Sequence, residues 1–196
     1  EEETGQKVYT VLQLRVHPAL LTLKNQIDQE THSKKHEIDL TYITSRGKWY
    51  LRSWKGNLER SGGLASNIGI HFYDMLIWLF GNVEKIEVHF ADSHTTAGYF
   101  ELERARVTWF LSIDSDNLPN EAKSSGQETY RSITIDENEI EFSGGFKDLH
   151  TVVYQKTLEG NGFRINDTRA AIQLVHDIRK ADPLGIKSNS HRYLKK

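Results

Sequence analysis

The chain has 196 residues, with 25 lysines and arginines against 27 aspartates and glutamates, and a formal net charge of −2. This length can bury a real hydrophobic core, and the balanced charge argues against an electrostatic nucleic-acid binder. The absence of cysteine excludes disulfides and thiolate chemistry, and no apolar run approaches the roughly 18 residues of a membrane span. We expect a cytoplasmic protein that binds neither nucleic acid nor membranes.

The first fifteen residues look like the end of a domain. Gly5 is a typical helix stop, and 8–15 (VYTVLQLR) is a nearly continuous apolar run. Such runs are typical of strands buried on both faces of a parallel sheet, and no other run in the chain closely resembles this one. We therefore predict that 1–15 is the C-terminal remnant of an upstream α/β domain, and that 16–196 forms a second domain. Pro18 suits the first turn of a following helix.

From about residue 36 the pattern changes to separate strands with few helices. The strand candidates are 36–44, 85–92, 104–114, 128–136 and 138–144. In the third candidate, alternation places Val107, Trp109, Leu111 and Ile113 on one face. Runs of strands with few helices predict an α+β domain with a large, mainly antiparallel open sheet and flanking helices.

Two helices are predicted beside this sheet. One covers 64–80, and the other covers 165–182 with Asp167 as its N-cap. A polar segment, 115–127, is predicted to be a loop. The buried stripe of the second helix is expected to contain Ile172, Val175 and Ile178.

The helix over 64–80 carries polar residues at an unusual place. At about 100° per residue, Asn67, His71 and Asp74 share an arc beside the apolar stripe rather than opposite it. A solvated face would normally lie opposite, so we predict that these side chains line a cleft. The structural alternative, a hydrogen-bonded histidine at the core edge with Asp74 as its partner, has about equal support from this pattern alone.

Other chemistries lack residues that they need. A His-x-x-Asp pair supplies two metal ligands, and no third is evident. The chain has no G-x-S-x-G nucleophile elbow, and no G-x-G-x-x-G or Walker A loop for a dinucleotide or ATP. The sequence therefore predicts no metal site and no phosphate cradle.

Two further stretches bear on ligand binding. Gln13 and Arg15 lie on one side of the predicted first strand at its carboxyl end, where open α/β sheets bind ligands. In 45–56 (SRGKWYLRSWKG), cations that include Arg46 and Lys55 alternate with aromatics, which suits a phosphorylated, ring-bearing ligand. The alternatives are a charged strand end that meets solvent and a loop whose aromatics cap the core.

Together these motifs resemble a known family. The order L-Q-L-R-x-H-P, R-G-x-W-Y-x-x-S-W-K-G and S-G-G-x-x-x-N-I-G-I-H-x-x-D is similar to the glucose–fructose oxidoreductase/inositol dehydrogenase/MocA family. Within this family, the motifs are most similar to those of the UDP-N-acetylglucosaminuronic acid 3-dehydrogenases of lipopolysaccharide O-antigen biosynthesis. The likeness covers most of 5–85 and the final helix. It implies an N-terminal Rossmann domain for NAD, absent from this sequence, and a C-terminal α+β domain that supports homo-oligomers.

The resemblance also implies roles for single residues. His71 matches the family's active-site histidine, which handles the proton of the hydroxyl being oxidised. Asp74 matches the aspartate one turn later, expected to orient His71 or the substrate. Asn67 matches an Asn/Asp position that could bond a sugar hydroxyl.

The remaining assignments concern the other stretches. Gln13 and Arg15 match a pair at the family's interdomain cleft. From charge alone, Arg15 and Lys55 are assigned to the substrate's carboxylate or pyrophosphate.

The leading hypothesis is the C-terminal domain of an NAD-dependent dehydrogenase that oxidises the C3 hydroxyl of a UDP-linked N-acetylated uronic acid. NAD would be bound mainly by the missing domain, so this chain by itself is expected to be inactive. One alternative is the same family acting on another sugar or polyol. The other is a non-catalytic sugar-nucleotide-binding or oligomerisation module, which the presence of both His71 and Asp74 disfavours.

Overall fold

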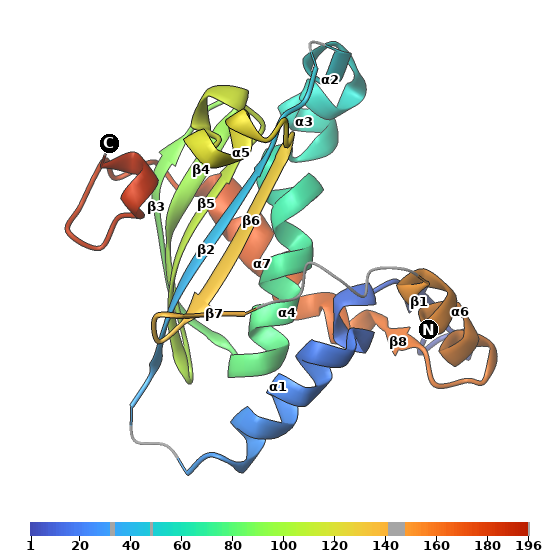
Figure 1. The fold of residues 1–196 in the computed structure, drawn as a ribbon. Coiled ribbons are helices and arrows are strands. Elements are labelled where there is room, and N and C mark those ends of the chain that lie inside the picture. Colours follow the sequence, from blue (N-terminus) through green and yellow to red (C-terminus); the bar gives the residue numbers. More distant parts are fainter. Residues whose placement is uncertain (32–33, 48, 141–147, 196) are drawn as a thin grey trace.

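The computed structural model describes residues 1–31, 34–47, 49–140 and 148–195, and places one large sheet against helices (Figure 1). Six strands hydrogen-bond in the order β3-β4-β5-β2-β6-β7. β2 and β5 pair in parallel, while the other ladders are antiparallel. The predicted α+β class is therefore confirmed. The strands are β2 His36–Thr44, β3 Val83–Ala91, β4 Thr95–Leu102, β5 Ala105–Ser112, β6 Thr129–Ile135 and β7 Asn138–Glu139.

The sequence pattern missed strand β4. Gly98 interrupts it, and glycine inside a strand often marks a close approach of another group. Here a Cβ at Gly98 would lie 2.2 Å from the Glu87 carbonyl oxygen and 2.8 Å from the Trp109 side chain. Glycine is therefore required at position 98, because strand β3 and the Trp109 side chain leave no space for a Cβ there. Strand β7 ends at Glu139, and residues 141–144 of the last predicted strand lie outside the described ranges.

Helices cover one face of the sheet and build the core there. They are α1 Pro18–Gln29, α4 Ile70–Phe80 and α7 Ile165–Lys180. The predicted inward face of β5 is confirmed, since Val107, Trp109 and Leu111 are buried in this core together with Ile113, which directly follows the strand. Tyr73 of α4 packs edge-on against Phe100 and Trp109, with ring centroids 5.7 and 5.6 Å away.

The opposite face of the sheet is partly covered by the C-terminal segment 183–195. His191 is buried, lies 3.0 Å from the Asp39 carboxylate and stacks on Phe110. Ser190 is bonded to the buried His89 at 2.9 Å. The sheet is therefore less open than the sequence suggested, because the chain's own end occupies part of this face.

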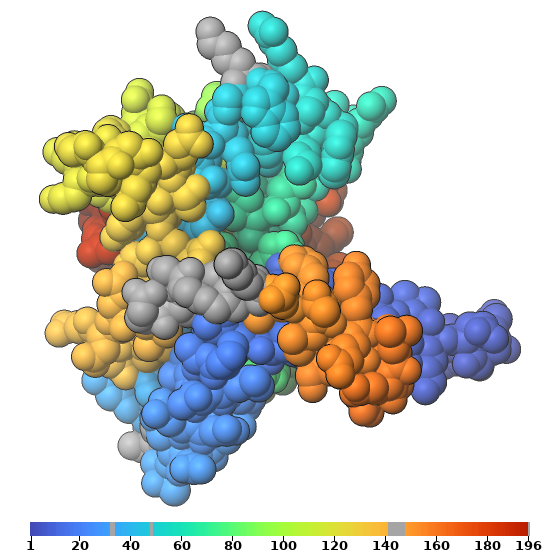
Figure 2. Space-filling model, turned by 45° about the vertical axis from the view of Figure 1, so that its right-hand side comes forward, coloured from blue at the N-terminus to red at the C-terminus, as the bar shows by residue number. Residues whose placement is uncertain are grey.

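Residues 8–15 do not form the predicted parallel strand. Strand β1 is limited to Tyr9–Thr10 and pairs antiparallel with β8, Phe163–Arg164. Gln13–Val16 then forms a 3₁₀ turn, η1. The run is apolar because Leu14 packs in the main core and Val11 packs against a cluster that contains Leu149 and Val153, instead of lying between strands. The N-terminal residues and α6, Leu149–Leu158, lie on one side of the molecule, at the right of Figure 2.

Two details of the last helix differ from expectation. Its N-cap is Arg164 instead of Asp167, whose carboxylate accepts a hydrogen bond from the Arg164 N–H at 2.6 Å. Ile172 is 58% exposed, whereas Val175 and Ile178 are buried as predicted.

The predicted loop 115–127 contains two short helices, and the described residues of 45–61 include three. These are η4 Ser115–Asn117, α5 Asn120–Ser124, α2 Trp49–Arg52, η2 Trp54–Gly56 and α3 Leu58–Ser61.

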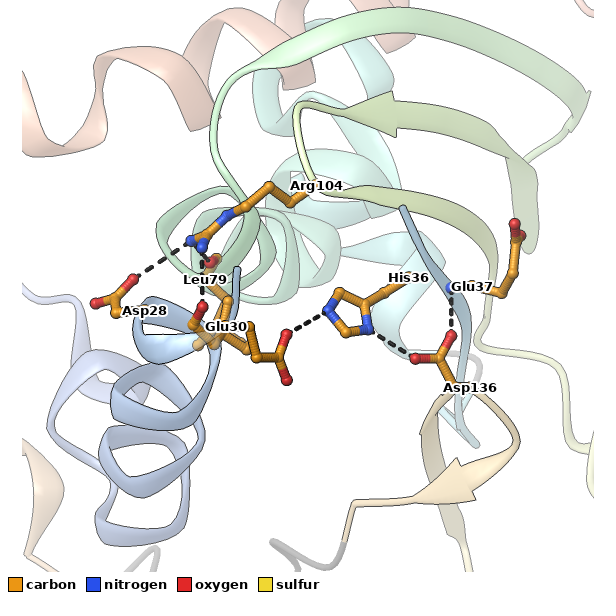
Figure 3. A network of polar contacts seen from close by, with 8 residues as sticks. Asp28, Glu30, His36, Glu37, Leu79, Arg104 and Asp136 are labelled. Atoms are coloured by element: carbon orange, nitrogen blue, oxygen red, sulfur yellow. Dashed lines mark hydrogen bonds and ion pairs between the residues drawn. The ribbon is translucent and has the colours of Figure 1, made fainter. Parts of the chain in front are cut away.

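A polar network fixes the C-terminal end of α4 (Figure 3). Arg104 donates to the carbonyl of Leu79 at 2.8 Å. His36, whose ring is 5.4 Å from that of Phe80, bridges the carboxylates of Glu30 and Asp136 at 3.0 and 2.7 Å. These contacts anchor the C-terminal end of α4. The first turns of the helix, at its other end, form the site described next.

Candidate active site

The site forms where the first turns of α4 meet the 3₁₀ turn η1. The helix begins before α4 itself, since Ala65–Gly69 forms a π-helical turn that runs into it. Such turns contain an extra residue and often occur at functional sites. Gly69 is needed because a Cβ there would lie 2.5 Å from the Tyr73 ring. The predicted helix over 64–80 is confirmed, with a local irregularity next to His71.

Arg15 and Asp74 form a buried ion pair at this junction. The guanidinium donates two hydrogen bonds to the carboxylate, at 3.0 and 2.7 Å, and a third to the Asp167 carbonyl at 2.8 Å. The two residues are 9% and 3% exposed. Burial raises the pKa of Asp74, while the charge of Arg15 opposes that rise.

This pairing changes what Asp74 and Arg15 can do. The sequence suggested that Asp74 orients His71 or the substrate, but its carboxylate is bonded to Arg15. The sequence also suggested that Arg15 meets an anionic substrate group, but Asp74 already neutralises it. Together they fix η1 against α4, which places Gln13 beside His71.

His71 stands at the edge of the core between two cavities. Its Nδ1 lies 3.5 Å from the Gln13 side-chain nitrogen, a long contact. A cavity of about 190 Å³, which Asp74 and Thr168 also line, lies on one side. A cavity of about 290 Å³ lies on the other. Its lining residues are Gln13, Leu14, Tyr42, Arg46, Asn67, Ile68, His71, Phe72 and Arg131.

The surroundings of His71 favour its neutral form. Desolvation lowers the pKa of His71, and nearby His150 lowers it further, while Asp74 raises it. A neutral imidazole near physiological pH can accept a proton. The side chain is also exposed, so it can reach a ligand in either cavity.

The other predicted site residues, Asn67 and Lys55, lie at different cavities. Asn67 lines the larger cavity, and its side chain donates to the Gly63 carbonyl at 2.9 Å. Lys55 lines neither cavity beside His71. It lies 6.0 Å from the centroid of the Trp54 ring, and lines a different cavity of about 350 Å³ together with Arg179.

The sequence did not identify Arg131 as a site residue. It lies on β6 directly opposite Tyr42 of β2, and its guanidinium is 5.5 Å from the Tyr42 ring centroid. No local pattern marks it, because only the strand register brings it to the cavity. Arg46, by contrast, was visible in the cationic and aromatic stretch 45–56.

The described ranges contain no group of three His, Asp or Glu side chains that could hold a metal ion. Nor do the described residues include a helix long and apolar enough to cross a membrane.

Comparison with known proteins places this domain. Residues 24–112 match the model of the oxidoreductase family, C-terminal alpha/beta domain. The structure of the WlbA (WbpB) dehydrogenase from Thermus thermophilus in complex with NAD and alpha-ketoglutarate matches with 50% identity and a TM-score of 0.92. The structure of the same dehydrogenase with NAD and UDP-GlcNAcA matches with 50% identity and a TM-score of 0.91. Each match covers 97% of this chain and 61% of the Thermus chain.

A more distant match shows the same fold. The WlbA dehydrogenase from Bordetella pertussis, in complex with NADH and UDP-GlcNAcA, is 20% identical with a TM-score of 0.67. That match covers 95% of this chain and 66% of the Bordetella chain. The family match, the sheet topology and the 50% identity agree with one another. This chain therefore belongs to the Gfo/Idh/MocA oxidoreductase family, as its C-terminal alpha/beta domain.

Proposed function

We propose that this chain is the substrate-binding and oligomerisation domain of an NAD-dependent sugar-nucleotide dehydrogenase. Its substrate would be a UDP-linked N-acetylated uronic acid, oxidised at the C3 hydroxyl in cytoplasmic lipopolysaccharide O-antigen biosynthesis. The observation that carries the proposal is 50% identity over 97% of the chain to a dehydrogenase crystallised with NAD and UDP-GlcNAcA. The proposal includes a division of the chain into two parts. Residues 1–15 would be the end of a dinucleotide-binding domain, and 16–196 would be the substrate-binding and oligomerisation domain.

The cofactor would be held mainly outside residues 1–196. The sequence contains no G-x-G-x-x-G loop for the phosphates of NAD. When bound, NAD accepts the hydride from the substrate carbon. This chain by itself is therefore proposed to be inactive.

In the proposed reaction His71 is the general base. Its neutral imidazole accepts the proton of the C3 hydroxyl as the C3–H bond breaks and the hydride leaves, so that the carbon becomes a ketone. Asn67, at the same cavity, is placed to bond a sugar hydroxyl. Arg15 and Asp74 are positioning residues, because they act by holding Gln13 and His71 together.

The proposal is tested with the intact protein that contains this chain. We expect NADH to form, measured by its absorbance, when NAD and UDP-GlcNAcA are added, and a 3-keto sugar to appear by NMR. Faster turnover of another sugar or of a polyol such as inositol would favour the same family with a different substrate. Binding of UDP-GlcNAcA without any oxidation would favour the non-catalytic module.

The pH dependence should show the lowered pKa of His71. Because the neutral imidazole is the active form, kcat/KM should fall only as the pH drops below histidine's ordinary value of about 6.5. Folding has a related dependence: the folded state binds this proton less readily than the unfolded state, so stability is lost as the pH falls below the unfolded pKa. The pH profile of kcat/KM measures the pKa of His71 in the functional protein. An acid limb centred above 6.5 would contradict it.

We also propose that the intact protein is a homo-oligomer. The face of the sheet opposite α4 carries the C-terminal segment and a polar remainder, and a second copy could cover both. Light scattering on the intact protein should give at least a dimer at micromolar concentration. A monomer under these conditions would contradict the proposal.

A further inference from the structure

Gln13 and His71 together form the polar wall between the two cavities of the candidate site. Among the described residues, three line both cavities: Gln13, Leu14 and His71. Leu14 is apolar and buried in the main core, so the polar part of this wall consists of the Gln13 amide and the His71 imidazole. A reactant in either cavity therefore lies next to this pair.

The carboxylate that follows one turn later on the same helix is not available to orient the imidazole. Asp74 lies three residues after His71 on α4, but both of its carboxylate oxygens accept hydrogen bonds from Arg15. Within the described ranges, the Gln13 amide is the one side-chain group that lies within 3.5 Å of a His71 ring nitrogen. The partner that can orient the ring is therefore uncharged.

The backbone of Gln13 is held firmly, while its side chain has room to turn. The next two residues, Leu14 and Arg15, are buried, and Arg15 joins η1 to α4 through its bonds to Asp74. The Gln13 side chain itself is half-buried and borders both cavities. A small turn of the amide or of the imidazole is enough to close the 3.5 Å contact to about 3 Å, the ordinary length of such a hydrogen bond.

The two ends of the amide select different tautomers of the imidazole. An amide nitrogen donates, so while it faces Nδ1 the imidazole keeps its own proton on Nε2. With the amide oxygen turned to Nδ1, that oxygen accepts the Nδ1–H, and Nε2 has the free lone pair. Because Nδ1 lies beside Gln13, Nε2 is the nitrogen left to meet a reactant. The second arrangement is the one that gives His71 a basic nitrogen there.

We propose that Gln13, and not Asp74, orients His71, and that its amide oxygen holds the Nδ1 proton so that Nε2 is the base. This inference rests on the proposed function. It makes Gln13 a positioning residue, in place of the substrate contact that the sequence suggested. A neutral amide fixes the ring without stabilising its charged form, whereas a carboxylate at the same place would favour the imidazolium. The base thus stays uncharged and ready to accept a proton.

The charges around His71 make the amide at position 13 decisive. Desolvation lowers the pKa of His71, and Asp74 raises it. Among the described residues that line the two cavities, Asp74 is the only carboxylate, and it is paired with Arg15. A carboxylate at position 13 would therefore be the first to contact Nδ1. The charged and titratable groups around His71 are Asp74 of α4, Arg15 of η1, His150 of α6, Arg131 of β6 and Arg46.

Replacing Gln13 by glutamate tests the role of the uncharged amide, since it keeps the shape and adds a negative charge. We expect the pKa of His71 in the intact protein, measured by NMR titration of its ring protons, to rise by about one pH unit. The acid limb of kcat/KM should move up with it, because the neutral imidazole is the active form. Gln127→Glu is the matched control, since Gln127 is exposed and lines neither cavity beside His71.

Replacing Gln13 by methionine tests the orientation, since it keeps the length of the side chain and removes the amide. We expect kcat to fall about 2- to 10-fold, the effect of one neutral hydrogen bond, with little change in KM or in the melting temperature. The tautomer is measured separately in the wild type with NADH and UDP-GlcNAcA bound, so that no hydride is transferred. At a pH above the pKa of His71, its ¹⁵N shifts should place the proton on Nδ1.

Three results would overturn the inference. One is a pKa of His71 that is the same in Gln13→Glu as in the wild type, and another is a bound wild type with the proton on Nε2. The third is a higher KM for UDP-GlcNAcA with unchanged kcat in Gln13→Met, which would show that Gln13 binds the substrate instead. If the wild-type protein does not oxidise UDP-GlcNAcA, the proposed function fails. The NMR titration of Gln13→Glu still decides whether Gln13 controls the protonation of His71.

Discussion

Replacing His71 by asparagine in the intact protein should slow hydride transfer by about 10²- to 10⁴-fold, the usual contribution of a general base. Asparagine has no basic nitrogen and cannot accept the hydroxyl proton. Stability should change little, because the His71 side chain is exposed and its contact with Gln13 is long. Single-turnover NADH formation measures the chemical step, and thermal melts measure the fold.

The structural alternative for His71 makes the opposite forecast. If His71 only supports the core edge, His71→Asn would melt early and still transfer hydride at a near wild-type rate when folded. NAD affinity is a useful control, because the phosphates of NAD are proposed to bind outside this chain. A normal NAD affinity together with slow chemistry would assign the defect to His71 itself.

Replacing Asp74 by asparagine should destabilise the fold strongly. The substitution removes the carboxylate that lies 2.7 Å from the buried Arg15 guanidinium and leaves only the partly exposed carboxylate of Asp167 at 3.8 Å, and breaking such a buried pair costs about 3–5 kcal/mol. Chemical denaturation of the intact protein gives the change in the free energy of unfolding of this domain. Turnover should also fall, since η1 would no longer hold Gln13 against His71.

A double variant separates the charge from the shape. Arg15→Met with Asp74→Leu removes both charges and keeps apolar volume, so it should regain much of the stability lost in Asp74→Asn. Lys24→Gln serves as the control, because its partner Asp28 is about half exposed and ion pairs with an exposed partner contribute little. An Asp74→Asn protein that unfolds at the wild-type midpoint would show that the pair does not stabilise the domain.

The strongest local patterns were sufficient to predict part of the fold. The alternation at Val107, Trp109 and Leu111 correctly identified the core face of β5, because a strand alternates its side chains whatever its neighbours are. The apolar stripe of 64–80 correctly gave the helix that carries His71. The mainly antiparallel sheet followed from the succession of strands with few helices.

Where a segment is shaped by distant contacts, the sequence pattern failed. Strand β4 was missed because Gly98, which gives space to β3 and to Trp109, breaks the alternation of its own strand. Residues 8–15 looked like a parallel strand, since burial against helices produces the same apolar run as burial within a sheet.

The candidate site shows the same division. Residue types and spacing pointed to His71 and Asp74 on one helix, because positions three apart lie on one side of it. Asp74 and Arg15 are 59 positions apart, so only the folded chain shows that they neutralise each other. Arg131 reaches the cavity through its register with Tyr42. The sequence by itself determined which side chains share a helix or strand face, since that depends on local geometry. Tertiary structure alone decided which of them meet and which charges pair with each other, because those depend on contacts between residues far apart in the chain.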